Sequence, residues 1–128
     1  MEPAYVEGCR VRVRPYALRS PGRGDVVVIR SPALPARLEL KRIVGLPDEE
    51  VVWTGGVVRI NGARLDEPYA RIPVSPPGDD QALFYRLRPG EYFVAGDNRL
   101  HSTDSRSYGP VALASIAGKA VVSVPMLR

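Results

Sequence analysis

The densest group of side chains that could do chemistry lies in one polar segment, Gly96–Gly109 (GDNRLHSTDSRSYG). Its hydroxyl, carboxylate, amide and guanidinium groups belong to Asp97, Asn98, Arg99, Ser102, Asp104, Ser105 and Arg106. Residues two apart in an extended backbone share a face, so we expect Ser102, Asp104 and Arg106 to point the same way. A hydroxyl beside a fixed Asp–Arg pair can orient a neighbouring catalytic group. The spacing alone leaves this interpretation and a plain polar surface loop equally open.

Lys41 is the second candidate, because arginine supplies nearly all the other positive charge. Only Lys41 and Lys119 are lysines among the 18 basic residues. Lys41 lies inside the alternating segment Leu38–Val44, a pattern that predicts a strand. A buried lysine can lose its proton, whereas an arginine essentially never does, so this position suits a neutral amine base. Spacing alone favours the simpler alternative, in which Lys41 faces outward beside Glu39.

Metal-binding and histidine-based chemistry have little support in the sequence. One histidine and one cysteine, His101 and Cys9, are too few for a usual zinc site, and no acidic segment has calcium-loop spacing. We therefore expect no metal and no cofactor. His101 could join nearby serines and Asp104 in a triad, but a lone exposed histidine is more often a bystander. Cys9 has no second cysteine with which to form a disulfide, so the cysteine content does not indicate whether the protein works in an oxidising or a reducing compartment.

Length and composition indicate one folded domain. The chain has 128 residues, of which 45% are hydrophobic and 25% charged, close to the average for soluble proteins. The net charge is +4, but the arginines are scattered and no aromatic-rich basic motif accompanies them, so we expect no nucleic-acid partner. Apolar runs are at most four residues long, far below the roughly 20 that a membrane-spanning helix needs, and we expect no signal peptide.

Short apolar or alternating runs separated by turn residues predict an all-β domain, with many short strands in a coiled, barrel-like sheet. The expected strands are Val11–Arg14, Asp25–Arg30, Leu38–Val44, Val51–Trp53, Val57–Ile60, Leu83–Leu87, Glu91–Ala95 and Lys119–Val124. Among them, the run Asp25–Arg30 is typical of a strand buried on both faces.

Glycine and proline mark the connections. Gly55-Gly56 and Asn61-Gly62 predict tight hairpin turns, and Arg88-Pro89-Gly90 predicts another turn. Val111–Ala117 is the one stretch expected to form a helical turn or two. Proline-containing surface loops are expected at Ser31–Ala36 and Ile72–Asp80.

The order of several motifs resembles that of bacterial type I signal peptidases, the membrane-anchored Ser/Lys peptidases of the secretory pathway. The matching segments are RGDVVV (23–28), KRIVGLP (41–47), INGARLDEPY (60–69), YFVAGDNR (92–99), STDSR (102–106), YGPV (108–111) and GKAV (118–121). The resemblance covers almost the whole chain, and the combination of KRxVGLP with GDNRxxSxDSR is highly specific. It implies a single signal-peptidase-like catalytic domain over residues 1–128.

The resemblance also implies roles at matching positions. Lys41 corresponds to the general base that takes the proton from the nucleophilic serine, and Ser102 to the hydroxyl that orients this lysine. Gly96 falls where the family keeps a small residue against the catalytic pair. The residues expected to support the base are Arg42, Asp97, Asn98, Arg99, Asp104 and Arg106, with Asp97 pairing with Arg42 and Asp104 with Arg106. We expect the Lys41 amine to lie within hydrogen-bonding distance of the Ser102 hydroxyl.

The implied substrates are signal peptides of secretory precursors, cleaved after a small residue. An extended substrate would add to a strand edge, with alternate side chains in shallow pockets. Met1, Tyr5, Glu39 and Leu40 match family positions near the substrate groove. The resemblance places the full-length protein at the extracytoplasmic face of the plasma membrane, held by an anchor that this chain lacks, and we expect the chain itself to be soluble.

The chain departs from the family where the nucleophile belongs. The family serine stands in a Ser-Met-x-Pro-Thr segment, and Met1-Glu2-Pro3 matches only Met-x-Pro, so the serine and its oxyanion-hole amide would precede residue 1. Ala4, Cys9 and Leu100-His101 replace the usual threonine, aspartate and Asp-Asn. We therefore expect the chain itself to be inactive.

Three interpretations of this departure compete. The favoured one is a shortened form of a protein whose serine and anchor helix lie upstream. The second is a non-catalytic homologue that binds peptides, and the third uses another serine or Cys9 as nucleophile. A self-cleaving repressor-type Ser/Lys domain is a further alternative, which the GDNRxxSxDSR pattern disfavours.

Overall fold

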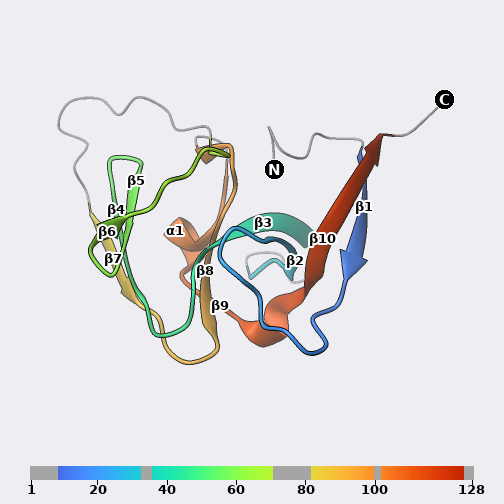
Figure 1. Ribbon diagram of the computed structural model, residues 1–128, viewed down its shortest axis with the longest axis horizontal. Coiled ribbons are helices and arrows are strands. Elements are labelled where there is room, and N and C mark those ends of the chain that lie inside the picture. Colours follow the sequence, from blue (N-terminus) through green and yellow to red (C-terminus); the bar gives the residue numbers. More distant parts are fainter. Residues whose placement is uncertain (1–8, 33–35, 71–81, 100–101, 126–128) are drawn as a thin grey trace.

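Two antiparallel sheets make up the computed structural model, which describes residues 9–32, 36–70, 82–99 and 102–125 (Figure 1). The larger sheet has the order β1-β10-β2-β3-β8-β9. Its strands are β1 (Cys9–Arg14), β2 (Val26–Arg30), β3 (Leu38–Gly45), β8 (Glu91–Ala95), β9 (Val111–Ala112) and β10 (Ile116–Pro125). The all-β prediction is confirmed, although the sheets do not close into a barrel.

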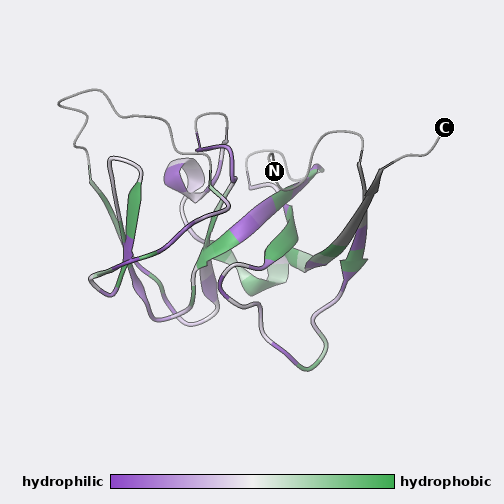
Figure 2. Ribbon diagram, turned by 45° about the horizontal axis from the view of Figure 1, so that its top comes forward, coloured by the Kyte–Doolittle hydropathy of each residue, from purple (hydrophilic) through white to green (hydrophobic). Residues whose placement is uncertain are grey.

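The smaller sheet has the order β6-β5-β4-β7 and lies at the other end of the molecule (Figure 1). Its strands are β4 (Glu50–Thr54), β5 (Val57–Ile60), β6 (Ala63–Arg64) and β7 (Leu83–Arg86). A short helix, α1 (Ser105–Tyr108), lies between the two sheets in this view and is hydrophilic (Figure 2). No helix of the described residues is long and apolar enough to cross a bilayer.

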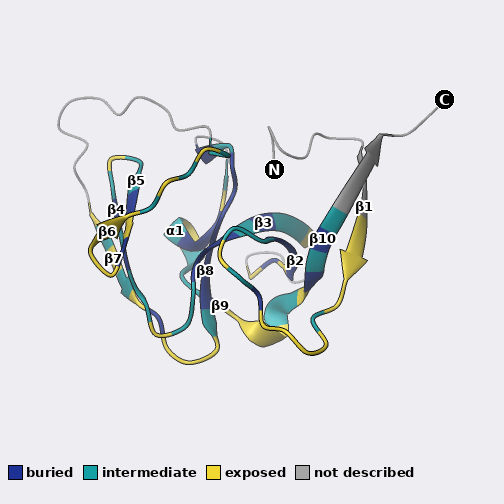
Figure 3. Cartoon of the chain, in the orientation of Figure 1, coloured by how far each residue is buried: buried dark blue, intermediate teal, exposed yellow. Residues whose placement is uncertain are grey.

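The core has two parts that share strands β3 and β8. One part joins the two sheets and is formed by Val44, Val51, Trp53, Val58, Ile60, Leu87, Phe93 and Ala95. The other lies on the opposite face of the larger sheet and is formed by Val27, Ile29, Ile43, Tyr92, Val94 and Val111. Because neighbouring residues of a strand point to opposite faces, β8 supplies both parts in alternation and is buried almost throughout (Figure 3). Because both faces of β8 are packed, the position of its last residue, Ala95, is fixed. The polar segment Gly96–Gly109 begins directly after this residue.

Local turn signals predicted the hairpins correctly. Gly55 and Gly56 join β4 to β5, and Asn61 and Gly62 join β5 to β6, with positive φ at all four residues. Two consecutive positive φ angles are typical of the tight turns that suit the twist of paired strands. The buried strand expected at Asp25–Arg30 is also confirmed as β2, which lies between β10 and β3.

Two further predicted connections are described, and the two predicted proline-containing loops fall wholly or partly outside the described residues. The turn at Arg88–Gly90 passes from the smaller sheet to the larger one, because β7 pairs with β4 and β8 pairs with β3. The helical turn expected in Val111–Ala117 is confirmed as a 3₁₀ turn at Leu113–Ser115, and β10 begins directly after it. The loop predicted at Ile72–Asp80, and residues 33–35 of the other loop, lie outside the described residues.

Candidate active site

Lys41 is buried in the larger sheet rather than facing water. It lies on β3 opposite Val27 of β2, and its residue exposure is 7%. Its Nζ lies 3.3 Å from Oε2 of Glu39, because residues two apart on a strand share a face. The simpler alternative, in which Lys41 faces outward beside Glu39, is therefore wrong in part. Lys41 does lie beside Glu39, but its side chain is buried.

Gly96 brings Lys41 and Ser102 together. The Gly96 N–H donates to Ser102 Oγ and to Asp104 Oδ2, both at 3.1 Å. A Cβ atom at this glycine would lie 2.7 Å from Ser102 Cβ and 3.9 Å from Lys41 Nζ. The close approach of Ser102 therefore requires a residue without a side chain here. Among the described side chains the ion-pair partner of Lys41 is Glu39, so a direct Lys41–Ser102 hydrogen bond stays a prediction.

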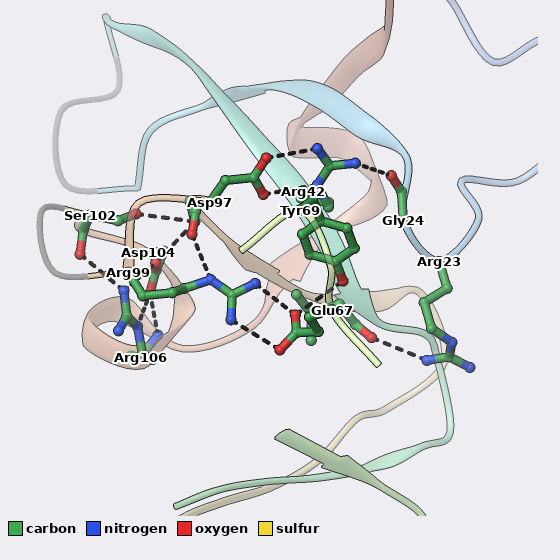
Figure 4. Close-up of polar contacts among 12 residues, drawn as sticks. Arg23, Gly24, Arg42, Glu67, Tyr69, Asp97, Arg99, Ser102, Asp104 and Arg106 are labelled. Atoms are coloured by element: carbon green, nitrogen blue, oxygen red, sulfur yellow. Dashed lines mark hydrogen bonds and ion pairs between the residues drawn. The ribbon is translucent and has the colours of Figure 1, made fainter. Parts of the chain in front are cut away.

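The expected pair between Arg42 and Asp97 is confirmed. Arg42 Nε and Nη2 donate to the two carboxylate oxygens of Asp97 at 2.8 and 2.7 Å, and Nη1 donates to the carbonyl of Gly24 at 2.8 Å (Figure 4). Asp97 is fully buried. The guanidinium also lies 4.1 Å from the centroid of the Tyr69 ring. These contacts connect the start of β2, the middle of β3 and the segment after β8, directly beside Lys41.

The second expected pair, between Asp104 and Arg106, is also confirmed. Arg106 Nε and Nη2 donate to the two Asp104 oxygens at 2.8 Å each (Figure 4). Burial acts to raise the pKa of Asp104, but the Arg106 guanidinium and hydrogen bonds from Ser102 and Gly96 outweigh it and hold this pKa below its ordinary value. Asp104 is therefore a fixed negative charge that accepts from the Ser102 hydroxyl.

The polar segment is not extended throughout, which corrects the expectation for its backbone. Asp104 accepts from the Arg106 backbone N–H as the N-cap of α1, so the chain turns into a helix at Ser105. Ser102, Asp104 and Arg106 still meet, but they do so around this cap rather than along one face of a strand. An aspartate just before the short run Ser105–Tyr108 is a cap signal that sequence analysis missed.

Three residues without an assigned role complete the polar network. Glu67 accepts two hydrogen bonds from Arg99, whose Nε also donates to the Gly96 carbonyl at 2.7 Å (Figure 4). Tyr69 donates its hydroxyl to Glu67 at 3.0 Å, and burial raises the pKa of this phenol. Trp53 lies under the guanidinium groups of Arg99 and Arg106. Glu67 and Tyr69 belong to the INGARLDEPY motif, but nothing in that motif indicates their partners.

A free strand edge runs beside Lys41. β3 pairs with β2 through Leu38–Arg42, but it pairs with β8 only from Arg42 to Gly45. Within the described part of the chain, the other edge of Leu38–Lys41 therefore has no strand partner. Glu39 and Leu40 are partly exposed along this edge. Unpaired backbone groups of this kind can hydrogen-bond an added extended peptide.

The hydroxyl of Tyr108 is buried near the same residues. Among the described side chains it has no hydrogen-bond partner. Burial raises its pKa, and the nearby negative charges of Asp104 and Glu39 raise it further. Tyr108 belongs to the YGPV motif, and nothing in that motif indicates a role for it.

The other expected site residues are less informative. Asn98 is partly exposed between Asp97 and Arg99, and its supporting role stays a prediction. Met1 and Tyr5, expected near the substrate groove, and His101 lie outside the described residues.

Comparisons with known proteins point to one family. The family described as signal peptidase, peptidase S26, matches residues 1–125. The chain is 31% identical over 130 residues to signal peptidase I V of Bacillus subtilis, covering 92% of this chain and 76% of that protein. It is 39% identical over 115 residues to signal peptidase I of Leptolyngbya laminosa, covering 84% of this chain but only 54% of that protein.

A solved structure is similar as well. The crystal structure of a signal peptidase I from Enterococcus faecalis aligns with a TM-score of 0.70 and 32% identity, and covers 82% of this chain and 100% of that one. The agreement therefore extends from sequence to three-dimensional fold. The family match spans nearly the full length, and the chain belongs to the signal peptidase family, peptidase S26.

Proposed function

We propose that this chain is the catalytic domain of a signal peptidase that removes signal peptides from secretory precursors by cleaving after a small residue. The observation that carries the proposal is the buried amine of Lys41 beside Gly96 and Ser102. A primary amine out of water is the type of base that a Ser/Lys peptidase needs, and its surroundings match the family motifs in type and order.

Lys41 acts as the general base in the proposed reaction. A serine hydroxyl attacks the scissile carbonyl and transfers its proton to Lys41 Nζ, which then protonates the leaving amine; water releases the acyl group in a second step. The family pattern places this serine just before the segment that Met1–Pro3 matches. The Ser102 hydroxyl donates to Asp104, so its oxygen remains an acceptor for a Lys41 N–H, and the Lys41 lone pair can face the nucleophile.

Glu39 competes with Ser102 for the Lys41 amine. Its carboxylate lies 3.3 Å from Nζ, so this ion pair has to open, and the ammonium has to give up a proton to water, before Nζ can accept the proton of the serine. The free edge of Leu38–Lys41 supports a way to open it, because a substrate strand that pairs there passes directly over Glu39 and Leu40. We propose that substrate docking displaces Glu39 and that shallow pockets beside this edge select small side chains.

Further parts of the proposal concern the whole protein. The natural protein acts at the extracytoplasmic face of the plasma membrane, where an anchor holds it near its substrates. Arg42, Asp97, Arg99, Asp104 and Arg106 support the base, and no nucleic acid takes part.

Cleavage of a precursor that carries alanine before its cleavage site tests the function. We expect the natural protein to cleave it, Lys41→Met to lower kcat by about 10²–10⁴-fold, and Lys119→Met, at the other lysine, to retain activity. Cleavage by Lys41→Met at the wild-type rate would rule out the assigned base. Tight peptide binding without cleavage by the natural protein would instead support the non-catalytic, peptide-binding alternative.

A further inference from the structure

We propose that Trp53 is a positioning residue that aligns Gly96 and Ser102 with Lys41, acting through Arg99 and Arg106; its catalytic consequence rests on the proposed function. Trp53 lies on β4, in the smaller sheet, whereas Lys41 lies on β3 of the larger one. Its residue exposure is 5%, and its ring lies 6.0 Å from that of Phe93. The side chain is therefore fixed in the core between the sheets.

Two guanidinium groups lie against the Trp53 ring. The Cζ atoms of Arg99 and Arg106 are each 4.8 Å from the ring centroid, within the range of a cation–π contact. Each guanidinium already has its own carboxylate, Glu67 for Arg99 and Asp104 for Arg106. The indole is thus not needed as a counter-charge. It supplies an apolar face that fixes two planar cations in place.

These two arginines hold the polar segment near both of its ends. Arg99 Nε donates to the carbonyl of Gly96 at 2.7 Å. Arg106 binds Asp104 through two hydrogen bonds, and Asp104 Oδ2 in turn accepts the Gly96 N–H. The carbonyl of Gly96 is therefore held by one arginine and its N–H, through Asp104, by the other.

The position of Ser102 follows from that of Gly96. Ser102 Oγ accepts the same Gly96 N–H, and Arg106 Nη2 donates to the Ser102 carbonyl at 3.4 Å. Lys41, by contrast, is held by the pairing of β3 with β2. A movement of either guanidinium on Trp53 would shift Ser102 relative to Lys41. A misplacement of about 1 Å in a catalytic group can cost on the order of 100-fold in rate.

The test compares three variants of the chain. Trp53→Leu removes the aromatic face, Trp53→Phe keeps one, and Phe93→Leu is the matched control. Phe93 is fully buried in the same core and contacts Trp53 and Tyr85, and no cation–π contact of Phe93 is found among the described residues. Both leucine variants therefore remove buried aromatic area, but only one removes the surface beneath the arginines.

The first readout is amide hydrogen exchange at Gly96, together with the free energy of global unfolding. We expect Trp53→Leu to speed Gly96 exchange about tenfold more than its loss of global stability explains. Trp53→Phe should restore most of the protection, and Phe93→Leu should change it only in proportion to stability. If Gly96 exchange in both leucine variants changes only in proportion to their loss of global stability, the inference is overturned. If Trp53→Leu does not fold, Trp53→Met decides in the same way, because the flexible methionine side chain fills more of the site but offers no aromatic face to the arginines.

The second readout is cleavage by the natural protein that carries the same substitutions. We expect Trp53→Leu to lower kcat with little change in KM, and Trp53→Phe to recover part of the loss. An unchanged kcat in Trp53→Leu, despite faster Gly96 exchange, would overturn the positioning role. A wild-type protein that does not cleave at all would contradict the proposed function, while the exchange measurement would still decide whether Trp53 holds Gly96.

Discussion

Arg99 and Glu67 form an ion pair with almost no contact with water. The two guanidinium–carboxylate distances are 2.6 and 3.2 Å, and the exposed fractions of the side chains are 1% and 3%. Taking two charges out of water is costly, so such a pair is retained only where geometry and further hydrogen bonds offset the loss of hydration. Here Tyr69 and the Gly96 carbonyl provide those further bonds. The pair connects the segment after β6 to the candidate active site.

Replacing Glu67 should therefore be strongly destabilising. Glu67→Gln leaves the buried Arg99 cation without its counter-charge, and we expect a loss of about 3–5 kcal/mol in the free energy of unfolding. Denaturant unfolding followed by tryptophan fluorescence measures this directly, since Trp53 lies against Arg99.

The matched control is an ion pair of the same type at the surface. Arg86 and Glu50 lie on β7 and β4, with side-chain exposures of 74% and 42%. We expect Glu50→Gln to change stability by only about 0–1 kcal/mol, because water already screens this pair. Equal effects of the two substitutions would contradict the assigned role of the Glu67 pair.

The features that could be predicted correctly from the residues alone have local signals. The Asn61-Gly62 turn and the buried strand β2 follow from residues adjacent in the chain, whose φ preferences and hydrophobicity need no distant partner. The Arg42–Asp97 and Asp104–Arg106 pairs came from the family resemblance, and their geometry agrees with it.

Contacts between the two sheets could not be predicted from the sequence, because they depend on how the sheets are placed relative to each other. Arg99 and Glu67 are 32 positions apart, and Trp53 lies on a strand of the other sheet. The sequence predicts a strand at Val51–Trp53, but it does not show that two arginines lie against the Trp53 ring. The helical turn at Ser105 was missed because one capping aspartate is a weak signal in so short a helix.

The Asp104 carboxylate should make stability depend on pH in the acid range. Its folded-state pKa lies below the ordinary value of 3.8, so its contribution is present above that value and is lost as the pH falls through the folded-state pKa. We expect Asp104→Asn to be less stable by about 2–4 kcal/mol at pH 7. Thermal unfolding measured from pH 7 to pH 2 should show the stability difference between the wild type and Asp104→Asn becoming smaller below about pH 4. A gap that stays constant over the whole range would contradict the assignment.

Arg42 should not tolerate lysine. Its planar group binds both oxygens of buried Asp97, donates to the Gly24 carbonyl and lies over Tyr69, and a lysine ammonium cannot match this fork. We expect Arg42→Lys to lower the free energy of unfolding by about 2–4 kcal/mol and to reduce any peptidase activity of the natural protein. Arg86→Lys, at an exposed ion pair, is the control and should stay within about 1 kcal/mol of wild type.

Gly96 should accept a larger residue only if Ser102 becomes smaller. An added Cβ would lie 2.7 Å from Ser102 Cβ, so we expect Gly96→Ala to destabilise the fold by about 1–3 kcal/mol. Ser102→Gly removes the opposing atoms, and the double variant should therefore regain most of this loss relative to Ser102→Gly alone. Gly22→Ala, whose Cβ would meet Asp25 at an ordinary 3.7 Å, is the control for a glycine-to-alanine change. Additive losses in a double-mutant cycle of unfolding free energies would show that the two positions are not in contact.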